Sequence, residues 1–380
     1  MERIKKVQAY VNSIFDEIKD DDRKRKAYIH SYGVAQFCSM LALKRGLNPE
    51  LANIIGLLHD VYAYKTGYRN LHAHNGAEMI RVAFKRELAD IFTDSEQTLI
   101  KSAVFHHTDK SYVHDEYDEL IKDSDVFQLW MFDVCADVFL GDRIAKTAKA
   151  LDIVLPEAIN DSEIPQKKIC FNKSKIADIA ESLAQKKIIG EKSNDDFIDI
   201  IKYFPESTAF DELKNAWCAA FVYHCCAEAG INLPIRAVHT AQRICDYRFA
   251  CVKAWYEWAK DKGFCFYEED GFIPQRGDIV IYYNIIPKEN KPQNSAWFDH
   301  TGIVLSCDSD YLTVAEGNVD NRNISGVIKR RRDKTIGCYI RIPDDYEYDG
   351  WKFDFKTGNI RCERKDPPST IVSGKFMINS

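Results

Sequence analysis

The decapeptide LANIIGLLHD, residues 51–60, carries the clearest structural signal in the first half of the chain. Its apolar residues recur at the spacing of one helix face, and this stripe ends in a histidine: Leu51, Ile54, Ile55, Leu58 and His59. The pattern predicts an amphipathic helix that carries His59 into the interior, where a polar ring must find a partner. Asp60 follows directly and adds a carboxylate beside it.

Three further segments direct a histidine inward by the same helical spacing, around His30, His72 and His106. A single buried histidine is usually a core residue whose ring is satisfied by a hydrogen bond. Four helices that each turn a histidine inward predict something different, because burying so many polar rings without a shared partner is unfavourable. Imidazoles and carboxylates clustered in a helical core are the donor set of a transition-metal or Mn²⁺ site.

The motifs that contain these residues resemble the HD superfamily of metal-dependent phosphohydrolases over about residues 25–135. They are YIHSYGVA, GLLHDVYAY, HAHNGA, FHHTDK and LIKDSDVFQ, and their order reproduces the pattern H…HD…H…HH…D. The resemblance implies a first ion bound by His30, His59, Asp60 and a late aspartate, and a second ion bound by His72, His106 and His107, with Asp60 as the bridge. Asp125 is preferred to Asp123 as the late aspartate because its setting is more similar to the final motif of the family. Helical periodicity leaves both aspartates open.

The chemistry follows from these ligands. Two divalent ions about 3.5–4 Å apart bridge a hydroxide and clamp a phosphoryl oxygen, which makes in-line attack feasible near neutral pH. We therefore expect one or two divalent ions, with Mn, Fe, Ni, Co, Mg and Zn not distinguished. The expected substrate is small and phosphorylated, either nucleotide-like or another phosphoester. Lys65 and Arg69 are candidate phosphate contacts, although solvated loop charges are the commoner role of such residues.

The second half of the chain has its own signal, AWCAAFVYHCCAEAGI at residues 216–231. Cys225 and Cys226 lie on a buried helical stripe and are expected to be core residues. Cys218 differs because it lies in the first turn of the predicted helix, where free backbone N–H groups and the helix dipole favour a thiolate. After Pro274 the short runs GDIVIYY, TGIVLSC, YLTVAEG and CYIRI predict a small antiparallel sheet.

A candidate base and its orienting group lie on two of these predicted strands. His300 opens one strand, and Glu316 lies late in the next, 16 residues further on, with Asn318 just after it. A hairpin with a short turn at 307–310 would set His300 against Glu316. Asp299 would point to the opposite face, so Glu316 is the preferred partner of the imidazole. A thiol, a base and a group that orients the base together indicate nucleophilic catalysis.

These segments resemble a CHAP domain, a cysteine- and histidine-dependent amidohydrolase/peptidase of papain-like fold, from about Lys175 to Asp344. The motifs are KIADIAESL, AWCAAFVYHCCAEAGI, VKAWYEWAKDKG, QRGDIVIYY, DHTGIVL and AEGN. The resemblance implies Cys218 as nucleophile, His300 as general base and then acid, and Glu316 as the residue that orients the imidazole. It also implies Asn318 as a polar helper near the oxyanion or the histidine, and a peptide or peptidoglycan amide as substrate.

Composition limits the partners and the location of the protein. The chain has 52 Lys and Arg against 58 Asp and Glu, a net charge of −6, which argues against a dedicated nucleic-acid surface. The first residues resemble no signal peptide, and no apolar stretch is long enough for a membrane span. The sequence therefore predicts a cytoplasmic protein with reduced cysteines, with release by a non-classical or phage-type route as the alternative.

The expected fold is multi-domain. An all-α HD-type domain over residues 1–150 is followed by a linker at 151–172. An α+β papain-like CHAP domain with an antiparallel sheet follows over 173–345, and a tail at 346–380 has no assigned role. The expected function is a two-domain hydrolase, a metal-dependent phosphohydrolase fused to a cysteine amidase or peptidase. Two alternatives are an HD half that binds a nucleotide as a sensor and regulates the amidase, and an interaction protein with degenerate sites.

Overall fold

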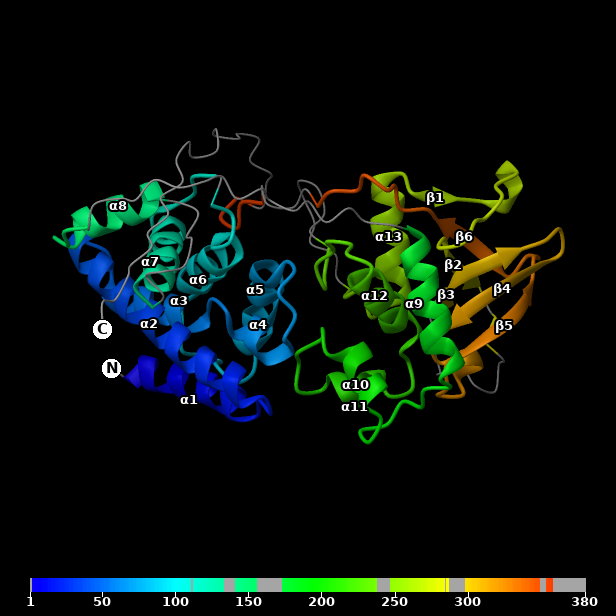
Figure 1. Cartoon of the computed structure of the whole chain (residues 1–380), viewed down its shortest axis with the longest axis horizontal. Helices are drawn as coiled ribbons and strands as arrows, with labels where there is room; N and C mark the ends of the chain where they lie inside the picture. The colour runs from blue at the N-terminus through cyan, green and yellow to red at the C-terminus, as the bar shows by residue number, and fades with distance from the viewer. Residues whose placement is uncertain are drawn as a thin grey trace, which may run out of the picture. The chain divides into compact units, whose positions relative to one another are not determined.

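The computed structural model describes residues 2–110, 112–132, 141–155, 173–237, 247–283, 285–286, 298–348 and 353–357. The chain divides into two compact units (Figure 1). Unit 1 comprises Met1–Lys167 and Trp351–Ser380, and unit 2 comprises Lys168–Gly350. The predicted order, an all-α region followed by an α+β region with an antiparallel sheet, is confirmed. Most of the predicted linker 151–172 and tail 346–380 lies outside the described residues.

Over residues 2–155, the described part of unit 1 is built from helices joined by turns. Its helices are α1 Glu2–Asp16, α2 Asp21–Arg45, α3 Pro49–Leu58, α4 Val61–Thr66, α5 His72–Ala83, α6 Asp94–His106, α7 Glu116–Phe132 and α8 Gly141–Ala150. Residues 353–357 also belong to this unit, although they follow unit 2 in the chain. Unit 1 is therefore built from two separate stretches of sequence.

Local sequence determines how α2 and α3 meet. Helix α2 begins after Asp20, whose side chain caps the helix by accepting a hydrogen bond from the backbone. The two helices pack so closely at Gly56 that a Cβ there would lie 2.5 Å from the Cα of Ala35. The glycine therefore allows the helix that carries His30 to approach the end of α3, which His59 follows directly.

Unit 2 combines helices with one six-stranded sheet. The helices are α9 Lys173–Gln185, α10 Asp195–Ile201, α11 Ala209–Leu213, α12 Cys218–Glu228 and α13 Val252–Lys262. The strands are β1 Cys265–Phe266, β2 Ile279–Tyr283, β3 Phe298–Cys307, β4 Tyr311–Glu316, β5 Gly326–Arg331 and β6 Ile336–Ile340, in the order β1-β6-β2-β3-β4-β5. Every pairing is antiparallel. The sequence runs predicted β2, β3, β4 and β6, whereas β1 and β5 were not predicted.

Both faces of the central strands are buried. One face carries a hydrophobic cluster of Val280, Tyr282, Val304, Leu312, Val314 and Tyr339. Ile279, Ile281 and Ile303 alternate with these residues along the strands and are also fully buried. Figure 1 shows α9, α12 and α13 gathered along one side of the strands. The central strands are therefore packed on both faces.

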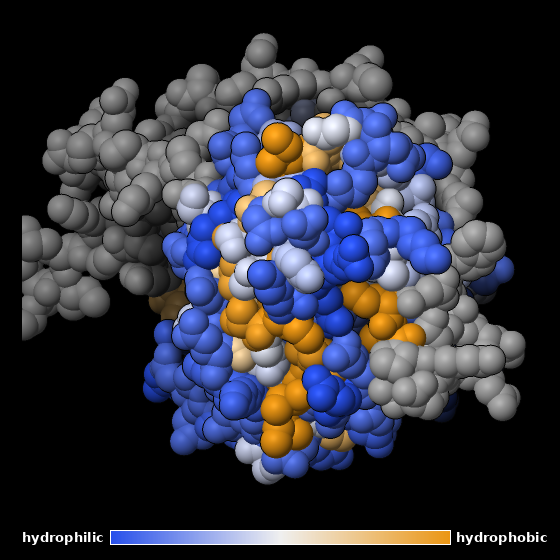
Figure 2. All heavy atoms as spheres, turned by 90° about the vertical axis from the view of Figure 1, so that its right-hand side faces the viewer, coloured by the Kyte–Doolittle hydropathy of each residue, from blue (hydrophilic) through white to orange (hydrophobic). Residues whose placement is uncertain are grey.

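The surface of unit 2 is mixed in character. Seen from the right-hand side of Figure 1, it shows mostly hydrophilic residues, with hydrophobic residues gathered in bands between them (Figure 2). Within the described ranges, none of the helices combines the length and the apolar character that a membrane crossing requires.

Candidate functional sites

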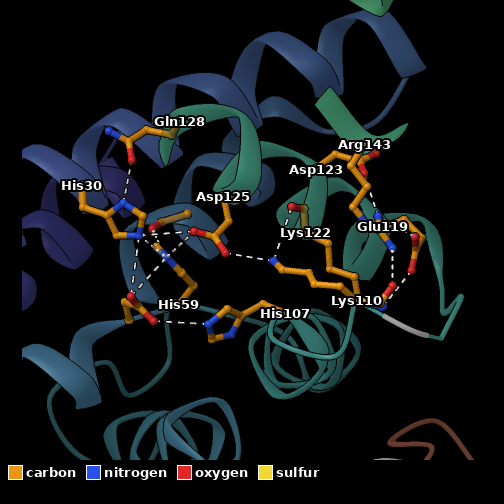
Figure 3. Close-up of polar contacts among 12 residues, drawn as sticks. His30, His59, His107, Lys110, Glu119, Lys122, Asp123, Asp125, Gln128 and Arg143 are labelled. Carbon is orange, nitrogen blue, oxygen red and sulfur yellow. Dashed lines mark hydrogen bonds and ion pairs between the residues drawn. The ribbon is translucent and has the colours of Figure 1, made fainter. Parts of the chain in front are cut away.

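The predicted metal ligands of unit 1 come from the ends and interiors of different helices (Figure 3). His30 lies within α2, His59 directly after α3, Asp60 directly before α4, His72 at the start of α5, His107 directly after α6, and Asp125 within α7. All of them are buried except His72, which is half-buried. Leu71, just before His72, has a left-handed φ of 48°, a strained conformation for a leucine that turns the chain into α5 beside the site.

The first group of ligand atoms surrounds His30 and His59. The Nε2 atoms of these two rings are 3.1 Å apart. One carboxylate oxygen of Asp60, Oδ2, lies 3.6 Å from His30 Nε2 and 3.8 Å from His59 Nε2. One oxygen of Asp125, Oδ1, lies 3.3 Å and 3.9 Å from the same two atoms. Two imidazoles and two carboxylates therefore converge on one point.

The second group surrounds His72 and His107. Their Nε2 atoms are 3.2 Å apart. The other oxygen of Asp60, Oδ1, lies 3.0 Å from His72 Nε2 and 3.2 Å from His107 Nε2. Each oxygen of Asp60 thus faces a different pair of histidines, which is the arrangement of a ligand that bridges two metal ions.

The hydrogen bonds on the far side of each ring show why these groups fit a metal. The Nδ1 atoms donate to oxygens that only accept: His30 to Gln128 Oε1 at 2.6 Å, His59 to Gly56 O at 2.8 Å, His72 to Arg69 O at 2.6 Å, and His107 to Val104 O at 2.7 Å. Because Nδ1 carries the proton, Nε2 of each neutral ring carries a lone pair. Lone pairs that face each other at 3.1–3.2 Å repel unless a cation lies between them. This donor set fits one or two divalent transition-metal ions.

The titration behaviour of His59 and Asp60 agrees with metal binding. Burial lowers the pKa of His59 to about 3, despite the nearby Asp60 carboxylate, so the ring is neutral. Burial disfavours the charge on Asp60, but His59 and His72 outweigh it and hold the pKa of Asp60 well below its ordinary value. Neutral imidazoles and ionised carboxylates are the protonation states that bind metal. Burial disfavours a charge on His30 and His72, but the Asp125 and Asp60 carboxylates outweigh it and raise the pKa of both rings, so a metal ion must displace a proton there.

The structure does not bring His106 into either group. Its Nδ1 lies 2.9 Å from Asp118 Oδ2, and its Nε2 donates to the backbone oxygen of Phe353 at 2.9 Å. Both nitrogens thus face protein groups, and neither is directed at the other predicted ligands. The helical spacing correctly placed His106 in the interior, but the interior partner is a segment 247 residues away in the sequence.

The two aspartates left open by the sequence occupy different surroundings on α7. Asp125 faces the histidines, whereas Asp123 is fully buried between two arginines. Arg45 Nη2 lies 2.6 Å from Asp123 Oδ2, and Arg143 Nη1 lies 2.7 Å from Asp123 Oδ1. The structure therefore brings Asp125, and not Asp123, to the candidate metal centre.

Lys110 belongs to this centre and was not identified from the sequence, although it ends the motif FHHTDK. Its Nζ lies 2.9 Å from Asp125 Oδ2, the oxygen turned away from the histidines (Figure 3). This bond holds the carboxylate with Oδ1 toward the rings.

Of the two candidate phosphate contacts, Arg69 is exposed and stacks its guanidinium 5.6 Å from the centre of the Tyr64 ring. Its position beside His72, through the backbone bond described above, puts a cation at the rim of the site.

The candidate cysteine site of unit 2 joins a helix start to two strands. Cys218 is the first residue of α12, and no side chain caps that helix end. His300 Nε2 lies 2.8 Å from Glu316 Oε2, and the other ring nitrogen, Nδ1, is buried without a partner at hydrogen-bond geometry. Burial disfavours a charge on His300, but Glu316 and the side chain of Cys218 outweigh it and raise the pKa of His300 to about 10. The arrangement therefore keeps the His300 imidazole protonated beside the Cys218 side chain.

Strand register explains how His300 meets Glu316. Strands β3 and β4 form the expected hairpin, with Val304 paired to Val314 across it. On β3, a Cβ at Gly302 would lie 2.7 Å from Glu316 Cγ, so only a glycine leaves room for the carboxylate to lie beside His300. Asp299 points elsewhere, since its Oδ1 accepts a hydrogen bond from the Ile285 N–H at 3.2 Å.

Asn318 lies close to this site but its amide serves the backbone. It adopts a left-handed φ of 55°. Its Nδ2 donates to the Asn215 backbone oxygen at 2.9 Å, and its Oδ1 accepts from the Asn323 N–H at 2.9 Å. These bonds tie the turn after β4 to the segment that leads into Cys218. The structure therefore gives Asn318 partners other than the expected imidazole or oxyanion.

Arg330 is a further residue of the cysteine site that sequence reasoning missed. It lies on β5 and donates to both oxygens of Glu316. The sequence GVIKRR carries no alternation of apolar and polar residues that would reveal it; in the structure, Arg330 falls in the half-buried register while Lys329 and Arg331 are exposed. Cys226 is buried, and burial raises the pKa of its thiol above the ordinary range, as expected for a core residue.

Comparison with known proteins assigns both halves of the chain. A family model of the HD domain matches residues 27–130, and a family model of the CHAP domain matches residues 210–318. The chain therefore carries an HD domain followed by a CHAP domain, as the motifs indicated. These two domains together support a metal-dependent phosphohydrolase fused to an amidase or peptidase.

One curated relative matches part of the chain. Ribonuclease Y of Opitutus terrae is 47% identical over 53 residues, which make up 14% of this chain and 10% of that protein. The match therefore spans only a tenth of the length of the relative. No solved structure matches the chain.

Proposed function

We propose that this chain is a two-domain hydrolase in which the HD domain cleaves a phosphoester bond and the CHAP domain cleaves an amide bond. The observation that carries the first activity is the pair of histidine groups on either side of Asp60, each with two Nε2 lone pairs facing each other. The hydrogen-bonded contact of His300 with Glu316, next to Cys218 at a helix start, carries the second.

In the HD domain, His30, His59, Asp60 and Asp125 would hold one divalent ion, and Asp60, His72 and His107 a second. Such ions supply Lewis acidity and a hydroxide nucleophile. The residues of the chain orient these ligands: Lys110 fixes Asp125, and Arg69 at the rim attracts the phosphate. The substrate would be a nucleotide or another phosphoester. The similarity to a stretch of a ribonuclease makes nucleotide phosphodiesters the first class to assay.

Metal analysis and a phosphoester panel test this activity. Full-length protein is stripped with a chelator, reloaded with Mn²⁺, and assayed for bound metal and for cleavage of bis-p-nitrophenyl phosphate, p-nitrophenyl phosphate and nucleotides. We expect bound metal and turnover in the wild type and in Asp115→Asn, an aspartate of unit 1 outside both ligand groups, but neither in Asp60→Asn. A wild-type protein that binds no transition metal and cleaves none of these substrates contradicts the proposal.

In the CHAP domain, the Cys218 thiolate would attack the amide carbonyl carbon and form a thioester. His300 would give its proton to the leaving amine and then take one from the water that hydrolyses the thioester. Glu316 holds the imidazole in place, and the backbone N–H groups at the start of α12 stabilise the oxyanion. The substrate would be a peptide or peptidoglycan amide.

Purified peptidoglycan, with release of new amines as the readout, tests this second activity. We expect Cys218→Ala to abolish amine release. Cys226→Ala, a matched change two turns further along the same helix, should retain it. Full hydrolysis by Cys218→Ala would show that another residue is the nucleophile.

A second candidate function has structural support of its own. In it, the HD domain binds a nucleotide without cleaving it and regulates the CHAP domain. The segment that follows unit 2 returns to unit 1, where the Phe353 backbone accepts a hydrogen bond from His106, next to the candidate ligand His107. A nucleotide that raises the melting temperature, stays uncleaved and changes the rate of amine release would favour this candidate.

A further inference from the structure

The buried Glu316 carboxylate needs more than one hydrogen-bond partner. It is fully buried, and a buried carboxylate with a single hydrogen-bond partner is unfavourable. His300 occupies one position at Oε2. Arg330 supplies the others, since its Nε lies 2.9 Å from Oε1 and its Nη2 lies 2.6 Å from Oε2. The guanidinium thus binds the carboxylate as a two-pronged fork.

One glycine and the strand register give these partners access to Glu316. Gly302 on β3 leaves room for the carboxylate to lie beside His300. Gly326 on β5 pairs directly with Glu316, so Arg330 extends from the strand that flanks β4 on the side opposite β3. The imidazole therefore approaches the carboxylate from one neighbouring strand and the guanidinium from the other.

Arg330 is itself held in place. Its third nitrogen, Nη1, lies 2.8 Å from Asp320 Oδ1. The guanidinium carbon lies 5.9 Å from the centre of the Tyr282 ring, which in turn stacks on the His300 ring at 6.1 Å. With an acid at each end and an aromatic ring beside it, the arginine has one well-defined position.

The turn that holds Arg330 also holds the nucleophile. Asp320 lies in a turn of left-handed residues that begins at Asn318, and Asn318 binds the Asn215 backbone three residues before Cys218. The start of α12 and the arginine are thus positioned by the same short segment.

We propose that Arg330 is a positioning residue of the cysteine site, which keeps Glu316 ionised and oriented so that His300 turns Nδ1 toward Cys218. The inference rests on the proposed amidase function. Because the guanidinium occupies both carboxylate oxygens, Glu316 cannot rotate away from His300. Because the guanidinium is positive, the shared proton stays on the imidazole rather than on the carboxylate.

The charged groups around the site predict how the pH dependence of Cys218 changes when Arg330 is removed. The groups that face this chain of contacts are Glu316 on β4, His300 on β3, Arg330 on β5, Asp320 in the turn, Tyr282 on β2, Tyr339 on β6 and Cys218 on α12. The positive charges of His300 and Arg330 face the carboxylates of Glu316 and Asp320 and, when it forms, a thiolate at Cys218. Without the arginine, the thiolate state carries an unbalanced negative charge in a buried place, and it forms only at higher pH.

The test measures iodoacetamide alkylation of Cys218 against pH by peptide mass spectrometry, together with amine release from peptidoglycan. We expect Arg330→Met to raise the pH midpoint of alkylation by about one unit and to lower amine release about tenfold or more. Arg330→Lys keeps the positive charge but not the two-pronged contact with Glu316. It should therefore keep the pH midpoint of the wild type and release amines more slowly. Lys329→Met removes a charge from the exposed register of the same strand and should match the wild type.

A folded Arg330→Met protein with the wild-type midpoint overturns the proposal, even if its melting temperature falls, because that result describes a structural role alone. Should Arg330→Met fail to fold, Asp320→Asn replaces it: removing that negative charge should lower the midpoint and, by loosening the arginine, reduce amine release. An unchanged midpoint there also overturns the proposal. A wild type that shows the expected alkylation pattern and variant shifts but cleaves no amide refutes the amidase function and leaves the positioning role standing.

Discussion

The two units both bury histidines beside carboxylates, but they use opposite nitrogens of the ring. In unit 1 the Nδ1 atoms of four histidines donate to fixed acceptors, and their Nε2 lone pairs converge. In unit 2 the Nε2 of His300 faces the Glu316 carboxylate, and its Nδ1 is left for a thiol. The comparison shows that the partner of one ring nitrogen decides the chemistry of the other.

The two sites also balance charge differently. In unit 1 Lys110 bonds to the Asp125 oxygen that faces away from the histidines, so the lone pairs and carboxylate oxygens at the centre call for a cation of their own. In unit 2 the guanidinium of Arg330 lies directly on the Glu316 carboxylate. A bound ion is thus suited to the first site, and a protein cation already neutralises the second.

The strongest test of this comparison pairs one variant in each unit of the full chain. Asp60→Asn removes the negative charge of the carboxylate that both ligand groups share. It should lower phosphoester cleavage at least about 100-fold, because even outer partners of metal ligands cost 10- to 100-fold. Alkylation of Cys218 should stay at the wild-type rate. Cys218→Ala should abolish amine release and leave phosphoester cleavage at the wild-type rate. If either variant eliminates both activities, the two sites are coupled, and the sensor function is favoured over two independent hydrolases.

Adjacent histidines give the next largest contrast. His107→Gln removes a converging Nε2 and should weaken metal binding about 10- to 100-fold, measured by metal titration of the stripped protein. His106→Gln keeps an amide that can donate to the Phe353 backbone, so metal binding should stay close to that of the wild type. Equal losses in both variants would return His106 to the ligand set that the family resemblance implied.

The titration of His300 predicts how stability changes with pH. Its pKa in the folded protein is raised from the ordinary 6.5 to about 10, against burial, by Glu316 and Cys218. The unfolded chain loses the proton near pH 6.5 while the folded protein keeps it. The stabilisation is therefore complete below pH 6.5 and is lost as the pH rises toward 10. Urea unfolding should show this decline in the wild type, on the order of a few kcal/mol, and a flatter curve in His300→Gln. If the stability curves of the wild type and of His300→Gln run parallel with pH, His300 does not carry the charge assigned to it here.

Sequence was a good guide where chemistry depends on spacing within one helix or hairpin. The inward histidines of unit 1 and the approach of His300 to Glu316 follow from periodicity and one short turn. The choice between Asp123 and Asp125 did not, because α7 is buried over most of its length and apolar spacing carries no direction there.

The residues that were missed or misplaced depend on contacts outside the helices and the hairpin that the sequence predicts. Arg330 reaches Glu316 only through the register of β5 on β4, and β5 was not predicted because GVIKRR shows no alternation of apolar and polar residues. His106 was expected at the metal because nothing in its own helix reveals that the Phe353 backbone, far along the chain, supplies its acceptor. The spacing of a histidine along a helix predicts that its ring is buried. Which group each ring nitrogen contacts is known only from the tertiary structure.

The returning segment gives the smallest expected effect and separates stability from chemistry in unit 1. Phe353 is buried and packs against Phe105, 6.2 Å between ring centres. Phe353→Leu keeps the backbone oxygen that His106 uses, so only packing is lost. We expect about 1 kcal/mol of destabilisation, a fall of a few degrees in the melting temperature, with metal binding and Cys218 alkylation unchanged. Lys356→Ala, which removes a half-exposed ion pair with Asp115, should change stability by less than about 0.5 kcal/mol. Metal loss in Phe353→Leu would instead make this segment part of the metal centre, since His106 alone separates it from His107.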